Sequence, residues 1–164
     1  KYDFDKENIM RRKDREITSY DKMLEIMQSC DCCRIGLKDK DSVYILPLNF
    51  GYEEKSGKLT LYFHGASEGK KIDLIKQQNT ASFEMDTKHQ LVEADVACSY
   101  SYLYQSIMGK GKISLVDDPE EKINGLECVM LHYSNNNTWK FNEEVLKRVA
   151  VIKIEVTEWS CKEH

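Results

Sequence analysis

The sequence predicts a mainly β protein, a small and mostly antiparallel barrel of six strands with peripheral helices. Six runs have the alternation or the β-branched and aromatic composition of strands, and turns or single helices separate most of them. The regular alternation of strand and helix that a doubly wound fold requires does not occur in this pattern. A barrel is favoured because closure removes the exposed edges of short antiparallel strands.

The predicted strands follow one another with little linking chain. In order, they are residues 33–37, 42–52, 58–64, 80–86, 96–117 and 149–159. Helices are predicted at residues 18–30, 67–78, 119–133 and 142–148. The turn "KSGK" between the second and third strands predicts that these two strands form a hairpin.

Local signals predict where some of these elements begin and bend. Asp118 as N-cap and Pro119 at the first helical position predict the start of the third helix. Thr18 is the predicted cap of the first helix. Gly109 and Gly111 predict a bend or a bulge within the fifth strand.

Length and composition indicate one soluble, globular domain. With 164 residues, 41% of them hydrophobic and 32% charged, the chain can bury a sizeable core. We assign residues 1–12 to an N-terminal arm and residues 13–164 to a single domain. The net charge of -4 gives no general reason to expect nucleic acid or a membrane as partner, and no apolar run reaches the length of a membrane span. Because no signal peptide is visible, we expect a cytoplasmic protein.

The six cysteines are expected to be reduced thiols, as in most cytosolic proteins. Cys30, Cys32 and Cys33 form the run "CDCC", which raises a metal site as the alternative. No second pair of Cys or His stands at finger-like spacing, so no metal is expected.

The stretch "YFHGASEGKKID" places two lysines where a helix is expected to begin. Ser67 is the predicted N-cap, so Lys70 and Lys71 fall near the first turn, where their charges oppose the helix dipole. Backbone amides, the serine hydroxyl and two ammonium groups together suit a phosphate. The alternative is that both lysines simply point into water.

Three further features are candidates for contact with a ligand. Pro47 interrupts strand 42–52, so a flat ligand could rest where the hydrogen-bond ladder is broken; an ordinary edge strand is the alternative. Gly109 and Gly111 in "SIMGKGKI" would let a ring approach closely or would serve as barrel corners. His64 ends a strand just before the lysines, where a cofactor contact or proton transfer competes with a structural role.

Basic residues also gather near the N-terminus in "MRRKDREI". A solvated arm is the default interpretation, and a contact with a phosphate on a partner subunit is the alternative. The basic residues are Arg11, Arg12, Lys13 and Arg15.

These motifs, in this order, resemble the nitroimidazole-resistance family of the pyridoxamine 5′-phosphate oxidase-like, flavin-binding split barrels. The motifs are "MRRKDREI", "CCRIGL", "YILPLNFGYE", "YFHGASEGKKID", "SIMGKGKI" and "DPEEK", and they span roughly residues 10 to 134. The resemblance implies a six-stranded antiparallel split barrel that forms a homodimer. FMN, or FAD in some relatives, would lie at the subunit interface.

The resemblance also implies a role for each matched residue. The implied cofactor contacts are Tyr44, Leu46, Pro47, Leu48 and Asn49 along the flavin ring, Phe63 and His64 near the ring and ribityl chain, Ser67, Lys70 and Lys71 at the phosphate, and Ser106 and Ile107 on the far side of the site. His64 matches the histidine that is implicated in the family's chemistry at the flavin.

The implied activity is flavin-dependent reduction of a small-molecule substrate, because members of this family reduce 5-nitroimidazole drugs to inactive amines. The alternative is a non-catalytic flavin- or haem-binding carrier or sensor. Two departures argue against pyridoxamine phosphate oxidation itself. Lys70 stands where true oxidases carry an arginine, and "EWSCKEH" lacks their arginine-containing substrate motif.

Overall fold

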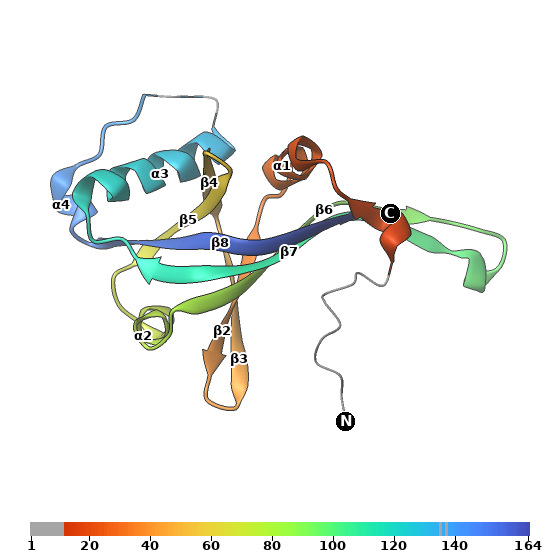
Figure 1. Ribbon diagram of the computed structural model, residues 1–164, viewed down its shortest axis with the longest axis horizontal. Coiled ribbons are helices and arrows are strands. Elements are labelled where there is room, and N and C mark those ends of the chain that lie inside the picture. Colours follow the sequence, from red (N-terminus) through yellow and green to blue (C-terminus); the bar gives the residue numbers. More distant parts are fainter. Residues whose placement is uncertain (1–11, 135, 137) are drawn as a thin grey trace.

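The structure is a computed structural model that describes residues 12–134, 136 and 138–164 (Figure 1). The strands are β1 (Glu16–Ile17), β2 (Cys33–Asp39), β3 (Ser42–Leu48), β4 (Phe50–Lys55), β5 (Lys58–Ala66), β6 (Thr80–Val92), β7 (Ser101–Leu115) and β8 (Val149–Glu163). The helices are α1 (Tyr20–Gln28), α2 (Lys70–Lys76), α3 (Pro119–Tyr133) and α4 (Glu143–Leu146), with 3-10 turns at Lys13–Arg15 and Ala97–Ser99.

All strand pairs in the described chain are antiparallel and belong to one sheet of order β3-β2-β6-β7-β8-β5-β4, with β1 paired to β8. β3 and β4 are the two ends of this order, yet only Asn49 separates them in the sequence. The sheet therefore curls until its two edges meet at Asn49. No ladder joins β3 to β4 in the part of the chain that is described, so this is a split barrel and the predicted mainly β class is confirmed.

The predicted number of six strands is too low, because the residues that the structure describes form a sheet of eight. The continuous run 42–52 is two strands: β3 pairs with β2 up to Leu48, and from Phe50 the chain pairs with β5 instead. The predicted hairpin thus forms only between β4 and β5. Composition cannot reveal this exchange of partners, because both halves of the run favour strand. The other strand that was not predicted is β1, which has only two residues.

One hydrophobic core fills the barrel. β5 alternates as predicted, with Leu59, Leu61 and Phe63 pointing inward. Two helices complete the same core: α1 contributes Met23, Ile26 and Met27, and α2 contributes Ile72, Leu74 and Ile75. The helix α2 is therefore fixed to the barrel by its apolar face, which holds its first residues in place.

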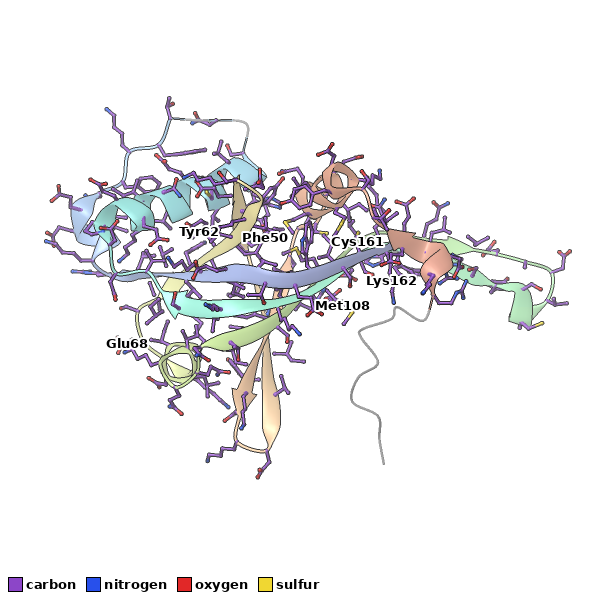
Figure 2. The ribbon with its side chains drawn as sticks, viewed as in Figure 1. Phe50, Tyr62, Glu68, Met108, Cys161 and Lys162 are labelled. Atoms are coloured by element: carbon purple, nitrogen blue, oxygen red, sulfur yellow. The ribbon has the colours of Figure 1, made fainter. Side chains whose placement is uncertain are left out.

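The helix α3 covers the outside of the barrel, over β4 and β5 (Figure 1). It begins as predicted: the Asp118 side chain accepts a hydrogen bond from the amide of Glu121 at 2.8 Å, with Pro119 in the first turn. Gly125 of α3 lies against the ring of Tyr62, which is seen between β5 and this helix in Figure 2. On β4, a Cβ at Gly51 would lie 2.2 Å from the backbone of α3. The close packing of α3 on β4 and β5 therefore requires a glycine on the sheet, Gly51, and a glycine on the helix, Gly125.

The glycines of β7 serve the barrel and not a ligand ring. A Cβ at Gly109 would lie 2.3 Å from the Phe83 ring, and one at Gly111 would lie 2.3 Å from the carbonyl oxygen of Glu155. The register between β7 and β8 also shifts at Gly111, as the predicted bulge requires. Of the two alternatives that the sequence left open, the structure supports barrel corners.

Several element ends differ from the sequence predictions. The α1 cap is Ser19, not Thr18, since the Ser19 hydroxyl accepts from the amide of Lys22 at 3.5 Å. The strand predicted from residue 96 begins at Ser101, and the strand predicted to end at residue 86 continues to Val92. β6 and β7 form a hairpin that extends beyond the barrel (Figure 1). Among the described residues, no helix is long and apolar enough to cross a bilayer.

Candidate functional site

The junction between β5 and α2 carries the two lysines singled out by the sequence. α2 begins at Lys70, so Ser67 is not its N-cap. Gly69 takes that position with a φ of 110°, a conformation that glycine adopts readily and other residues rarely do. Backbone geometry, and not the presence of a capping hydroxyl, therefore decides where this helix begins. Ser67 and Glu68 lie in the exposed loop before it, and Glu68 is labelled in Figure 2.

Lys70 reaches towards the hairpin of β2 and β3. Its Nζ lies 2.6 Å from Oδ2 of Asp39 and 4.8 Å from the centre of the Tyr44 ring. The hydrogen bond with Asp39 raises the pKa of the Lys70 ammonium above its usual value. The lysine is about half exposed, at 56%, while the Asp39 side chain is 21% exposed. Lys70 therefore already has an anionic partner within the protein.

Lys71 points the other way, back over the end of β5. A Cβ at Gly65 would lie 2.2 Å from Nζ of Lys71, so the ammonium occupies the space that any other residue would fill there. No ion pair is formed by Lys71 with the acidic side chains that the structure describes. His64 precedes Gly65 on β5 and is exposed. This arrangement fits a phosphate, because it leaves one ammonium group available to an outside anion.

The two lysines thus contact opposite sides of the split in the barrel. Lys70 lies against the β2–β3 hairpin, and Lys71 lies against β5. A surface pocket of about 500 Å³ lies beside Lys70, between α2 and the turn of that hairpin, and Lys71 does not line it. Its lining residues are Lys38, Asp39, Lys40, Lys70, Asp73, Leu74, Gln77 and Gln78.

The predicted ring-contact residues lie on β3, which forms one edge of the sheet. Pro47 pairs with Arg34 and is exposed, as expected for a proline in an edge strand. Leu46 is buried in the core, whereas Tyr44 and Leu48 are half-buried. Asn49, at the split itself, is exposed. A ligand along this edge would meet Tyr44, Pro47 and Asn49 through their side chains, and Leu46 chiefly through its backbone.

Phe63 and Ile107 have fully buried side chains that belong to the barrel core. A ligand could therefore contact Phe63 and Ile107 only through their backbone atoms. Ser106 is half-buried on β7, beside Lys162 of β8 and Asp86 of β6. Across the sheet, the residues paired in sequence from Tyr44 through β2 and β6 lead to a point near Gly111 on β7. Gly111 is five residues from Ser106, which corresponds to about 17 Å along the strand. One chain therefore does not bring Ser106 and Ile107 together with the lysines.

The outer sheet face, defined here by Val43, Ile45, Pro47, Arg34 and Met108, carries large exposed apolar side chains. Val43 is 63% exposed, Ile45 is 64% exposed and Met108 is 60% exposed. Figure 2 shows Met108 on the side of β7 that faces away from α1 and α3. Arg34 lies between these positions and forms ion pairs with Glu84 at 3.0 Å and Asp86 at 2.5 Å.

The basic N-terminal segment is only partly described. Residues 1–11, and with them Arg11 and most of the predicted arm, lie outside the described residues. Arg12 pairs with Asp14 at 2.6 Å. Arg15 donates to Nε2 of His164 at 3.1 Å and to the hydroxyl of Tyr104 at 3.4 Å. Arg12 and Arg15 thus have partners within the chain.

The cysteines of "CDCC" pack into the fold. Cys30 and Cys33 are fully buried, and burial raises the pKa of the Cys30 thiol to about 12. Within the described residues, no three side chains of the metal-binding types converge on one point. All six cysteines are free thiols.

Sequence reasoning missed Asp39 and Gly65. Asp39 ends a strand next to a polar turn, and such an acidic residue is indistinguishable from a solvated one in the sequence. Gly65 directly follows His64 and precedes Lys70 by five residues, so its place in the stretch "HGASEGKK" is the available signal.

Architecture and site together define an antiparallel split barrel with a basic cluster at the junction of a strand and a helix. The chain belongs to the pyridoxamine 5′-phosphate oxidase family, because the sequence pattern of that family matches residues 19–163. The family expected from the ordered motifs is therefore confirmed.

Solved structures agree with this assignment. A candidate 5-nitroimidazole antibiotic resistance protein from Bacteroides thetaiotaomicron is 31% identical, with a TM-score of 0.78 over 90% of this chain and 86% of that one. The flavocytochrome Anf3 from Azotobacter vinelandii shares the fold at 18% identity, with a TM-score of 0.78 over 95% and 72% of the two chains. The FAD and heme binding protein from Mycobacterium smegmatis does so at 15% identity, with a TM-score of 0.75 over 91% and 73%. No curated protein sequence matches the chain.

Proposed function

We propose that this protein is a flavin-dependent oxidoreductase that reduces small electrophiles such as 5-nitroimidazole drugs. The proposal is based on the position of Lys71. Its ammonium group occupies the space beside Gly65 that a side chain would otherwise fill. Exposed His64 is the residue before Gly65, and Lys70 lies on the opposite side of the split. Membership of the family and 31% identity to a candidate nitroimidazole resistance protein support it. The flavin supplies the electron transfer, and the residues of this chain bind and orient it.

Most of the predicted site residues have a role in this proposal. Lys71 and Lys70 bind the phosphate through charge-assisted hydrogen bonds, with Ser67 adding a hydroxyl. FMN is the proposed cofactor, and FAD is its alternative. The edge of β3 from Tyr44 to Asn49 lies along the flavin ring, where Pro47 leaves no amide to compete for a partner. His64 orients the substrate or supplies a proton.

We further propose that the working unit is a homodimer with the flavin at the subunit interface, in the cytoplasm. Ser106 lies about 17 Å along the sheet from the row of Tyr44, so it can face the same flavin only if a second copy supplies it. The outer sheet face supports the same arrangement, because its exposed apolar side chains would be buried between subunits. Free thiols are also typical of cytosolic proteins.

A second candidate function is a carrier or sensor that binds flavin or haem without turnover. The observation that favours it is the shared fold with the flavocytochrome and with the FAD and heme binding protein. The two functions differ in whether the reduced protein passes electrons to a nitro group.

The test begins with protein purified without added cofactor. We expect a flavin absorption spectrum and release of FMN on denaturation, because the family and the lysine pair both favour this ligand. After reduction under anaerobic conditions, a 5-nitroimidazole should reoxidise the protein. With the reduced protein in at least threefold molar excess, so that six electrons reach each nitro group, the amine should appear in mass spectrometry. Tightly held flavin without electron transfer would favour the carrier instead, and a colourless protein that FMN does not stabilise would exclude both.

A double variant links this result to the site. Lys70→Ala with Lys71→Ala should weaken FMN binding by about 100-fold, since two charge-assisted hydrogen bonds are lost. The matched control is Lys140→Ala with Lys147→Ala, which removes the same charge outside the candidate site. Titration of the apoprotein by quenching of flavin fluorescence measures both. Equal affinities in the two double variants would remove the phosphate assignment.

A further inference from the structure

The carboxylate of Asp39 lies where it opposes the proposed phosphate. It holds Nζ of Lys70 at 2.6 Å and is itself mostly shielded, with a side chain that is 21% exposed. Lys70 also lies 4.8 Å from the centre of the Tyr44 ring, so two contacts keep the lysine on the β2–β3 hairpin. A ligand that recruits Lys70 must share it with Asp39.

The position of Asp39 relative to α2 is fixed. The Gln78 side chain, just after α2, accepts from the amide of Lys38 at 3.0 Å and donates to the carbonyl oxygen of Lys38 at 3.2 Å. It also donates to the carbonyl oxygen of Leu74 in α2 at 3.0 Å. These three hydrogen bonds of Gln78 join the end of β2 to α2, the helix that carries both lysines. Asp39, the next residue after Lys38, therefore stays beside the site.

The two lysines differ in how available their ammonium groups are to a ligand, because Asp39 pairs with Lys70. Lys71 makes no ion pair with a described acidic side chain, whereas Lys70 is neutralised by Asp39. Like charges a few ångströms apart at a partly exposed site change a binding constant severalfold. A phosphate near Lys70 is repelled by Asp39 and must share the ammonium with it.

We propose that Asp39 is a selectivity residue that lowers the affinity of this site for phosphate-bearing flavins, by competing with the phosphate for Lys70. The inference rests on the proposed flavin function and adds a determinant to it. Lys71 then provides the main phosphate contact, and Lys70 a weaker one. Riboflavin, which has no phosphate, is unaffected by Asp39.

The experiment measures dissociation constants of FMN, FAD and riboflavin for the full-length apoprotein by quenching of flavin fluorescence. Asp39→Asn keeps the size and a hydrogen-bond acceptor for Lys70 but removes the charge. It should tighten FMN by about three- to tenfold and leave riboflavin unchanged. A gain for FMN alone assigns the site to a terminal phosphate, and a gain for FAD alone assigns it to a diphosphate; either supports the proposal.

Asp41→Asn is the matched control, because it removes the same charge from the same turn and Asp41 forms no ion pair among the described residues. It should change FMN affinity less than twofold. In addition, Lys71→Met should weaken FMN binding more than Lys70→Met. Circular dichroism confirms that each variant is folded.

Three results would overturn the inference. Unchanged affinity for both FMN and FAD in Asp39→Asn would show that the carboxylate does not compete. Weaker FMN binding in that variant would show that Asp39 positions Lys70 for the ligand. A larger loss in Lys70→Met than in Lys71→Met would reverse the order of the lysines. Wild-type protein that binds no flavin at all would refute the proposed function as well, which distinguishes that failure from these three.

Discussion

At the scale of single residues, His132 on α3 shows how burial constrains protonation. Its Nε2 donates to the carbonyl oxygen of Cys30 at 2.7 Å, since a carbonyl can only accept. Its Nδ1 is buried without a hydrogen-bond partner in the described structure. Burial lowers the pKa of His132, because an added proton on Nδ1 would bring a charge into this apolar site.

This gives a prediction for the pH dependence of stability. The folded-state pKa of His132 lies below its unfolded value of about 6.5, so the unfolded chain binds the proton first. The contribution of His132 to the free energy of unfolding is fully present above about pH 6.5 and falls as the pH drops towards the folded pKa. Urea denaturation at pH 7.5 and pH 5.5 should show this loss, and His132→Gln should reduce it. His89→Gln, on the exposed hairpin, is the control; an equal reduction there would contradict the assignment.

The sequence indicates which candidate residues lie close together only where the signal is local. Lys70, Lys71 and His64 all belong to one short motif, and the structure places them around one junction. Asp39 and Tyr44 are distant in sequence, and their contacts with Lys70 exist only because β2, β3 and α2 pack together. Ser67 was misassigned as a cap because serine composition indicates a capping preference but not the conformation of Gly69.

At the scale of elements, the packing of α3 on β4 depends on the absence of a side chain at Gly51. We predict that Gly51→Ala destabilises the fold by about 1–3 kcal/mol, because its Cβ would lie 2.2 Å from the backbone of Cys128, which cannot move aside without shifting the helix. Gly36→Ala is the control, since its nearest neighbour is a Val43 side-chain atom at 3.3 Å. Chemical denaturation measures both. Similar midpoints for the two variants would show that α3 adjusts freely.

Elements with capping or alternation signals were predicted well from the sequence, as α3 and β5 show. The division of residues 42–52 into β3 and β4 was not predicted. Every residue of that run is compatible with a strand, and the break depends on which partner strand is available on each side of Asn49. Such a choice is made by the tertiary structure, so local sequence carries little information about it.

At the scale of the whole molecule, the outer sheet face gives a test of the proposed dimer. Ile45→Asp places a charge in the centre of this apolar surface, and we expect it to shift the protein from dimer to monomer in sedimentation velocity. FMN affinity should fall with it, since Ser106 would no longer be supplied by a second copy. Val145→Asp is the control, because Val145 is similarly exposed, at 57%, but lies on α4. A monomeric Ile45→Asp protein with unchanged FMN affinity would contradict the shared site.

The link at Asn49 has a mechanical consequence for the barrel. No ladder pairs β3 with β4 in the described chain, so the covalent link at Asn49 and the shared hydrophobic core hold the two edges together. A small change in the width of this seam would therefore break no backbone hydrogen bond between β3 and β4, although it would disturb the packing of the core. The seam should resist a change in width less than the hydrogen-bonded strand pairs do, and Tyr44, His64 and the two lysines lie along it.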